Sequence, residues 1–292
     1  MLLCVSVGPE RHLWGVGPSP PVEISGSRRL PAVLIATWNV NSLNARMPRV
    51  EEWLADVEPD VLCLQETKMS DAQVPGMDFQ RLGYDSVHHG EGRWNGVAIL
   101  SRVGIADVIA GFDDGREPDP DARMLWATCG GVRIGTVYVP NGREIGHEHY
   151  AYKLDWLGRL RSHLDAHHSP DELLVLLGDW NIAPTDQDVW SAAAFEGSTH
   201  VTPAERDALA GVVDWGLVDT LRHRYPEDGI FSYWDYRNGD FHKRRGMRID
   251  YLLASAALAE RVEVDLIDRN ARKGSKPSDH TPVLAVYDVE PT

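Results

Sequence analysis

The sequence predicts an α/β fold whose buried strands end in polar residues, and three observations support this prediction. Short continuous apolar runs, such as residues 173–177 (LLVLL), are typical of strands buried on both faces. Amphipathic helical stretches lie between several of these runs, which is the order of strand–helix–strand units. Several runs also end in Asn, Asp, Glu or Tyr. We therefore expect a layered protein with a functional site where the strands end.

Composition limits the classes of function. The 292 residues suffice for one large domain or two small ones with a sizeable core. A net charge of −15, from 29 basic and 44 acidic residues, argues against a protein that simply coats a polyanion. It leaves room for nucleic-acid binding through one basic face, and the acidic excess suits a divalent-metal site.

The cysteines and the apolar segments favour a cytoplasmic protein. Cys4, Cys63 and Cys129 are isolated in the sequence, so neither a disulfide framework nor a zinc site is expected. No apolar run approaches the length of a membrane span, and residues 1–8 lack the basic start and the cleavage site of a signal peptide. Residues 1–31, with five prolines and no periodicity, predict a flexible extension or a segment upstream of the true start.

The first half of the remaining chain begins with a strand–helix–strand unit. Residues 32–40 predict a buried strand that ends near Asn39 and Asn41. Pro48 is expected to open a helix, which Pro59 ends. Four further strands are expected over residues 60–64, 96–101, 124–128 and 132–139, with Glu66 after the first and Tyr138 near the end of the last.

The second half repeats the plan of helix, strand and polar end. Residues 147–168 predict a long helix that leads into the strand beginning at Leu173, and Thr202-Pro-Ala-Glu205 predicts the start of another helix. The last two strands are expected over residues 251–254 and 283–287. Between the helix and the first of these strands lie an aromatic segment (residues 231–237) and a basic loop (242–245), and a polar turn (278–282) lies between the two strands.

The segment of residues 173–184 (LLVLLGDWNIAP) shows how a strand end delivers polar groups. If the chain stays extended, Asp179 and Asn181 lie on the same side of it, where a rigid strand can hold them for chemistry. Trp180 between them is expected to point into the packing. The alternative is an ordinary turn in which Asp and Asn bond their own backbone.

The polar residues at the strand ends are carboxylates, carboxamides, one phenol and one histidine. They are Asn39, Glu66, Tyr138, Asp179, Asn181, Asp250, Asp279 and His280. Oxygen ligands without clustered Cys or His favour a hard cation, Mg²⁺ or Mn²⁺, and such a cation beside one His fits hydrolysis of a phosphodiester. Each residue also has a structural alternative: a cap for Asp250, a turn pair for Asp279 and His280, a solvated charge for Glu66, and core packing for Tyr138.

Eight segments in a fixed order point to a known family. They are TWNVNSL (37–43), LCLQETK (62–68), VYVPNG (137–142), GDWNIAP (178–184), LVDT with Arg222 (217–222), FSYWDYR (231–237), MRIDYLLAS (247–255) and SDHTPV (278–283). Together they resemble the exonuclease III family of apurinic/apyrimidinic endonucleases, in particular its bacterial branch, within the endonuclease/exonuclease/phosphatase superfamily. The resemblance implies one catalytic phosphodiesterase domain over residues 32–290, built as a four-layer α/β/β/α sandwich of two packed mixed β-sheets.

The resemblance also implies a role for each strand-end residue. Glu66 would be the main Mg²⁺ ligand, with Mn²⁺ able to substitute and with Asn39 and Asp279 close by. Asp179 would position or deprotonate the attacking water. Asn181 would hold the scissile phosphate and Tyr138 would contact it or assist the leaving oxygen. His280, oriented by Asp250, would stay protonated and donate to a phosphate oxygen.

Further residues are implied in substrate recognition. The pocket for a sugar without its base would be formed by Tyr233, Met247 and Ile249, with Trp234 behind them, although packing of the aromatics in the core is the alternative. DNA phosphates would be met by residues that lie in the strand ends and basic loops: Asn41, Arg143, Lys243, Arg244 and Arg245. Solvated loops are the alternative for the basic segments.

The implied activity is Mg²⁺-dependent DNA repair in the cytoplasm, in association with the nucleoid. A monomer would cut double-stranded DNA on the 5′ side of abasic sites, degrade strands 3′→5′ and trim blocked 3′ ends in base excision repair. Two alternatives remain at this point. One is a phosphoesterase of the same superfamily acting on RNA, inositol phosphates or sphingomyelin. The other is a DNA-end-binding protein that has lost its chemistry.

Overall fold

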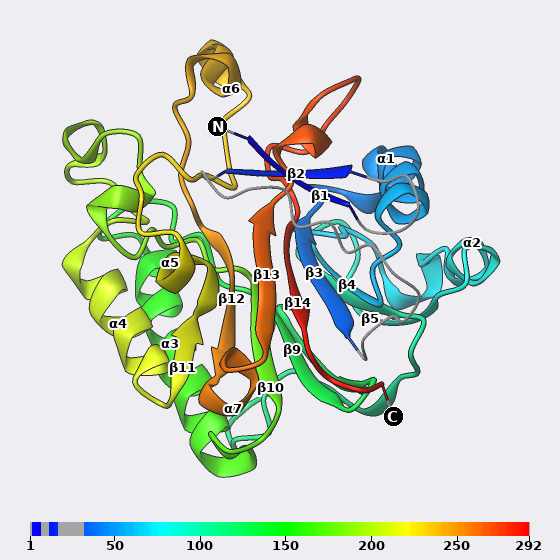
Figure 1. Cartoon of the computed structure of the whole chain (residues 1–292). Helices are drawn as coiled ribbons and strands as arrows, with labels where there is room; N and C mark the ends of the chain where they lie inside the picture. Colours follow the sequence, from blue (N-terminus) through cyan, green and yellow to red (C-terminus); the bar gives the residue numbers. More distant parts are fainter. Residues whose placement is uncertain (1, 7–11, 17–31, 292) are drawn as a thin grey trace.

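The computed structural model describes residues 2–6, 12–16 and 32–291, and it has two six-stranded sheets packed face to face with helices outside (Figure 1). The first sheet has the order β13 (Val262–Ile267), β14 (Val283–Tyr287), β3 (Val33–Asn39), β4 (Val61–Gln65), β6 (Val97–Ser101), β5 (Asp85–His89). The second has the order β11 (Leu217–Asp219), β12 (Asp250–Ser255), β10 (Leu174–Asp179), β9 (Val132–Tyr138), β8 (Met124–Cys129), β7 (Ala106–Ala110). The predicted four-layer α/β sandwich is confirmed.

The helices form the two outer layers. The helices α1 (Leu43–Val57) and α2 (Gly76–Arg81) lie against the first sheet, and α3 (Glu148–His167) and α4 (Pro203–Val213) lie against the second (Figure 1). Three short helices, α5 (Thr220–Arg224), α6 (Asp240–Lys243) and α7 (Ala256–Ala259), lie in the connections of the second half.

Burial of strands on both faces explains their continuous apolar sequences. In β3, Val33 and Ile35 point into the core between the two sheets, whereas Leu34 and Trp38 pack in the layer beneath α1. In β10, Val175 and Leu177 contribute to the inter-sheet core, and the residues that alternate with them face α3 and α4. Because successive side chains point to opposite faces, both must be apolar when both faces are covered.

The first predicted helix starts earlier than expected. It begins at Leu43 rather than Pro48, because Ser42 accepts a hydrogen bond from the Ala45 amide (3.4 Å) and caps the helix, leaving Pro48 inside it. The predicted helix over residues 147–168 is confirmed as α3. The buried face of α3 includes Lys153 as well as apolar side chains, a point that the apolar stripe did not indicate.

Four strands of the two six-stranded sheets were not expected from the sequence: β5, β7, β11 and β13. Each lies at the edge of its sheet, and β7 is exposed along its whole length. An edge strand has one neighbour only and buries less of its surface, so its sequence lacks the continuous apolar run that identifies a central strand.

Residues 1–31 contain two short described strands, β1 (Leu2–Ser6) and β2 (His12–Val16), which pair antiparallel. The rest of the predicted flexible extension lies outside the described residues. Among the residues that the structure describes, no helix is long and apolar enough to cross a membrane.

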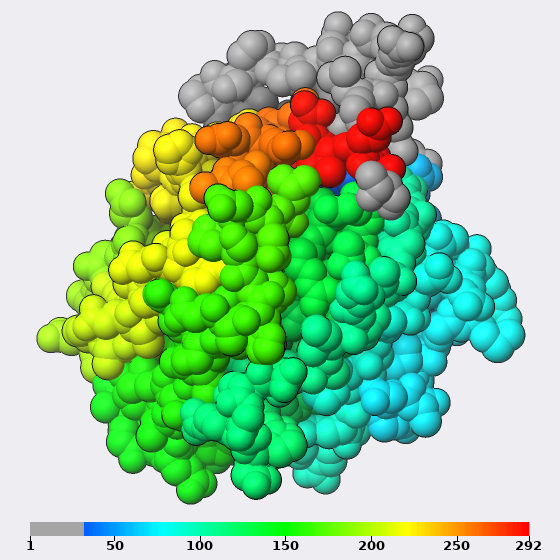
Figure 2. Space-filling model, turned by 90° about the horizontal axis from the view of Figure 1, so that it is seen from below, coloured from blue at the N-terminus to red at the C-terminus, as the bar shows by residue number. Residues whose placement is uncertain are grey.

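The strand directions bring the polar ends to one edge of the sandwich. The C-terminus, which follows β14, lies at the lower edge in Figure 1, and β3 runs antiparallel to β14, so β3 ends at the edge from which α6 projects. Viewed from below, the opposite edge shows cyan, green and yellow segments next to one another in chain order (Figure 2). Because β4 runs parallel to β3, it ends at the same edge, and the polar residues that follow these strands meet near α6.

Candidate active site

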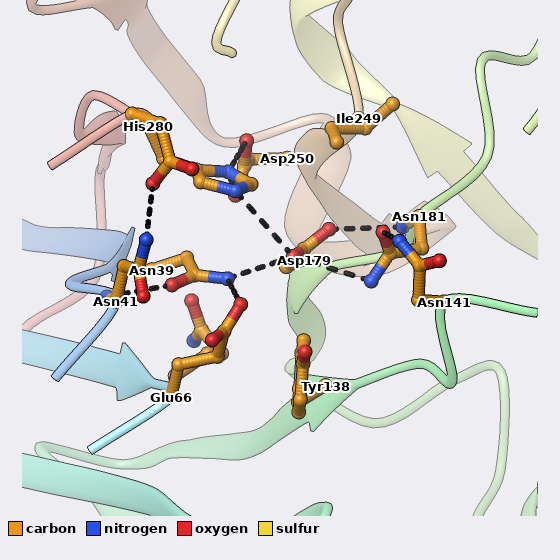
Figure 3. A network of polar contacts seen from close by, with 12 residues as sticks. Asn39, Asn41, Glu66, Tyr138, Asn141, Asp179, Asn181, Ile249, Asp250 and His280 are labelled. Atoms are coloured by element: carbon orange, nitrogen blue, oxygen red, sulfur yellow. Dashed lines mark hydrogen bonds and ion pairs between the residues drawn. The ribbon is translucent and has the colours of Figure 1, made fainter. Parts of the chain in front are cut away.

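The site is built where β3 and β4 of one sheet meet β9, β10 and β12 of the other. Asp179 is paired in register with Tyr138 on one side and with Asp250 on the other, so three polar residues lie side by side at the end of the second sheet. Asn39 ends β3, and Glu66 follows β4, the parallel neighbour of β3. The ends of the two sheets therefore supply one cluster of polar side chains (Figure 3).

Asn39 joins the two sheets. Its fully buried Nδ2 donates to Glu66 Oε1 (2.9 Å) and to Asp179 Oδ2 (2.8 Å). Its Oδ1 accepts the amide of Asn41 (2.9 Å), which fixes the orientation of the carboxamide. Asn39 thereby holds two carboxylates at a set separation.

The backbone after β10 forms the turn that was the alternative interpretation of residues 173–184. The chain does not stay extended, because Asn181 has φ +51°, and its amide donates to Asp179 Oδ1 (2.9 Å). Asn181 Nδ2 donates to Val139 O (2.9 Å) and lies 3.3 Å from Asp179 Oδ2. A turn, rather than strand alternation, brings Asp179 and Asn181 together. Trp180 is buried and stacked on Tyr251 (5.3 Å between ring centroids), as expected.

Gly178 is required by the close approach of β9. Its φ is +151°, and a Cβ at this position would lie 1.9 Å from Val137 O. Only glycine lets the backbone of β10 pass β9 here, so Gly178 fixes the position from which Asp179 projects.

His280 lies between two aspartates. Its Nδ1 donates to Asp250 Oδ2 (2.8 Å), and its Nε2 lies 3.8 Å from Asp179 Oδ2. Burial disfavours the imidazolium, but the negative charges of Asp250 and Asp179 outweigh burial and raise the pKa of His280 to about 10. Ser232 Oγ donates to Asp250 Oδ2 (2.7 Å) and so fixes the partner of His280.

For Asp179, burial outweighs the favourable charge of its neighbour His280. Burial raises the pKa of Asp179 to about 7, with Asp250 and Glu66 adding to the rise and His280 opposing it. A carboxyl group with this pKa can accept a proton near neutral pH, and His280 beside it can donate one. This pair is suited to handle a water molecule and a developing negative charge.

Glu66 is the centre of a possible cation site. Ligand atoms of Glu66, Asp179 and His280 all lie within 4.8 Å of one another. Burial opposes the charge of Glu66, but Lys68 (2.8 Å from Oε2) and Asn39 lower the pKa of Glu66 below its usual value. An ionised carboxylate with a second carboxylate, that of Asp179, close to it fits a hard divalent cation.

Asp279 is linked to Glu66 indirectly. Asp279 Oδ1 accepts from Asn41 Nδ2 (3.1 Å), and Asn41 Oδ1 accepts from Lys68 Nζ (2.6 Å). Tyr138 lies on the other side of the cluster, where burial and the nearby charge of Glu66 raise its pKa well above the ordinary value and keep the phenol neutral.

The predicted pocket residues are only partly brought together. Met247 and Ile249 form a small apolar cluster with Ala183 and Val189, against which Tyr233 packs. Tyr233 also contacts His280, with 4.8 Å between ring centroids. Trp234 is buried outside this cluster, edge-on to Phe241 (5.2 Å).

The predicted DNA-contacting side chains differ in their surroundings. Lys243, Arg244 and Arg245 lie in and after α6 and are exposed, and Arg143 is exposed with φ +57° in the loop after β9. Arg245 has its guanidinium over the ring of Trp190 (5.0 Å), a contact that the sequence did not indicate.

Asn141, Lys153 and Glu205 support the turn at Asn181, and sequence reasoning did not assign them to the site. Asn141 Nδ2 donates to Asn181 Oδ1 (3.1 Å). Lys153 Nζ donates to Asn181 O (2.7 Å) and to Glu205 Oε1 (2.6 Å), and both charged side chains are fully buried. The signal for Asn141 was its Pro-Asn-Gly turn. Lys153 could have been found as a lone cation within the apolar face of α3.

Comparison with known proteins is consistent with this geometry. Residues 36–280 match the model of the Endonuclease/Exonuclease/phosphatase family. The chain is 32% identical over 266 residues to "Exodeoxyribonuclease III" of Haemophilus influenzae, covering 86% of this chain and 98% of that one. It is also similar to the structure of an AP endonuclease from Archaeoglobus fulgidus (39% identity, TM-score 0.85, covering 88% of this chain and 100% of that chain). A third relative is the 3′ phosphatase NExo from Neisseria bound to a product DNA hairpin (38% identity, TM-score 0.83, covering 87% and 99%).

Proposed function

The chain belongs to the endonuclease/exonuclease/phosphatase family and is a DNA repair nuclease, and on this basis we propose that it is a Mg²⁺-dependent enzyme that cleaves DNA on the 5′ side of abasic sites. We further propose that it degrades strands 3′→5′ and removes 3′ blocking groups. The observation that supports this most directly is the chain of contacts from Glu66 through Asn39 and Asp179 to His280. These contacts support the proposal that a cation ligand, a proton acceptor and a proton donor act within one cluster.

In this proposal Asp179 orients the attacking water and takes its proton, as its raised pKa allows. His280, held protonated by Asp250, donates to a phosphate oxygen and stabilises the negative charge of the transition state. Asn181, whose carboxamide is oriented by Asn141 Nδ2, would hold the scissile phosphate. Tyr138 remains a neutral donor near the leaving oxygen.

Glu66, with Asn39 and Asp279 nearby, would hold the cation. The carboxylate of Glu66 is ionised and a carboxylate oxygen of Asp179 lies within 4.8 Å of it, and carboxylate oxygens are the ligands that a hard ion prefers. When bound, such an ion offsets phosphate charge and acts as a Lewis acid. Mn²⁺ would substitute because it accepts the same ligands.

The proposed substrate is double-stranded DNA with abasic sites or 3′ ends, bound by a monomer. The apolar cluster of Met247 and Ile249 with Tyr233, next to His280, supports a pocket for a sugar that has lost its base. The basic residues Lys243 and Arg244 near the same edge support contacts with DNA phosphates. We also propose that residues 32–290 act as one catalytic domain, which the core shared by both sheets supports.

The test is incision of a labelled duplex with a single abasic analogue, with Mg²⁺, Mn²⁺ or EDTA. We expect a product cut on the 5′ side that depends on the metal, and no product with Asp179→Asn. Duplexes with 3′-phosphate or recessed 3′ ends measure the other activities. RNA and an inositol phosphate complete the panel, and turnover of one of these without DNA incision would support the other phosphoesterase classes instead.

A further inference from the structure

A solvent-exposed indole lies at the border of the apolar cluster. Trp190 is 39% exposed, although it is large and apolar. One neighbour is Phe195, which meets it edge-on (6.4 Å between centroids, 74°), and the other is Arg245, whose guanidinium lies 5.0 Å from the ring centroid. The ring is therefore oriented by two contacts and still open to solvent.

The backbone fixes how far Trp190 lies from the catalytic histidine. Isolated bridges pair His280 with Tyr233, Tyr233 with Met247, and Met247 with Val189, the residue before Trp190. The Trp190 amide donates to Gly246 O (3.0 Å), which continues this pairing. Antiparallel partners lie about 4.5–5.5 Å apart, so three steps place Val189 within roughly 15 Å of His280.

That distance is within reach of a nucleotide a few positions from the cleaved phosphate. Bases in B-form DNA rise by about 3.4 Å along the axis, so about 15 Å spans some four nucleotides from the cleaved phosphate. Basic side chains gather in the same loop, where Lys243, Arg244 and Arg245 are exposed, in a chain whose net charge is −15. A polyanion is thus favoured here over an acidic or apolar protein surface.

We propose that Trp190 and Arg245 form a stacking subsite for an unpaired nucleobase within about four nucleotides of the cleaved phosphate. Aromatic rings and arginine side by side bind bases of any sequence through stacking and cation–π contacts. A paired base inside a duplex has both faces covered, so the subsite selects bases at frayed ends, single-stranded overhangs or bulges. The subsite rests on the proposed function, because it assumes that DNA occupies the adjacent catalytic site.

The test is equilibrium binding of the full-length protein, in EDTA, to a blunt duplex and to a duplex with a four-nucleotide single-stranded overhang. Stacking is worth about 1–3 kcal/mol per base, so Trp190→Ala should weaken binding of the overhang substrate roughly 5- to 100-fold and binding of the blunt duplex less than about twofold. Trp190→Phe keeps a stacking ring and should retain most of the affinity. Arg245→Gln should weaken overhang binding to a smaller extent.

Combining the Trp190→Ala variant with removal of single bases from the overhang identifies the base that stacks on Trp190. Each overhang base is replaced in turn by an abasic spacer, and at one position the spacer should abolish the difference between wild type and Trp190→Ala. The subsite would be overturned if Trp190→Ala weakened binding of the blunt and the overhang duplex equally. It would also be overturned if the effects of Trp190→Ala and of the spacer on the binding free energy were additive at every overhang position. Incision of an internal abasic site measured in parallel tests the proposed function separately: intact incision with unchanged overhang binding refutes only the subsite.

Discussion

Two buried carboxylates lie on either side of the turn at Asn181, and they have opposite properties. Burial raises the pKa of Asp179 to about 7, because its neighbours do not fully offset the loss of water. Burial also opposes the charge of Glu205, but Lys153, Thr199 and the His200 amide lower its pKa to about 2. The same chemical group is thus poised for proton transfer where its charge is poorly compensated, and is structural where hydrogen bonds satisfy it.

Asn181 connects the two environments. Its backbone carbonyl accepts from Lys153 Nζ (2.7 Å), and its backbone amide donates to Asp179 Oδ1 (2.9 Å). The Lys153–Glu205 pair therefore supports the turn that carries the reactive groups.

Asp179→Asn removes the poorly compensated charge. We expect DNA incision to fall by about 10³-fold or more, because the water loses its proton acceptor. Thermal stability should stay the same or rise, since a buried charge with a raised pKa costs folding energy. Activity assays and calorimetry check this, with the exposed Asp186→Asn as the matched control. If Asp179→Asn kept its activity, or lost several degrees of Tm, the contrast between a reactive Asp179 and a structural Glu205 would be contradicted.

Lys153→Met removes one partner of the compensated pair. Breaking a buried ion pair leaves an unpaired charge, so we expect a loss of about 3–5 kcal/mol in the free energy of unfolding, measured by denaturant titration. Incision should fall as well, because Asn181 O loses a donor. The double variant Lys153→Met/Glu205→Gln should recover part of the stability. If Lys153→Met is as stable as wild type, the pair has no supporting role.

The acid sensitivity of folding should depend on Glu205. The pKa of Glu205 is about 2 in the folded protein against an ordinary value of 4.5, so its contribution is complete above pH 4.5 and is lost as the pH falls towards 2. The full contribution is about 3 kcal/mol at most. Glu205→Gln should therefore lower stability at pH 7 and show a shallower loss between pH 4.5 and 2. Parallel slopes for the two proteins in that range would be evidence against this assignment.

His200→Gln should have the smallest effect. His200 Nδ1 donates to Asn181 O (2.5 Å), and burial together with Lys153 lowers the pKa of His200 to about 4, so the imidazole is neutral. Glutamine keeps a donor without charge, and Lys153 still holds the same carbonyl. We expect kcat/KM for abasic DNA to change no more than about fivefold. A loss as large as that of Asp179→Asn would mean that His200 takes part in the chemistry.

Prediction from the sequence succeeded where a signal is local. Central strands such as β14 were predicted with their observed bounds, since burial on both faces leaves a continuous apolar run. The helix start at Thr202 was predicted from its capping box, in which Glu205 bonds back to Thr202. The start of α1 was wrong because Ser42 is a cap without the acidic partner that usually marks one, and Pro48 was a more conspicuous signal.

The α/β order, the central strands and the set of polar residues at their ends follow from the amino-acid sequence alone, because side-chain periodicity and turn chemistry depend on neighbouring residues. The folded chain was needed to show that Asn39 joins Glu66 to Asp179 across two sheets, and that Asn181 reaches Asp179 through a left-handed turn. It was also needed to show that Lys153 and Glu205, 52 residues apart, neutralise one another beneath that turn. Compensation of a buried charge depends on groups brought from distant parts of the chain, so the reactive and the structural carboxylate cannot be told apart before the chain is folded.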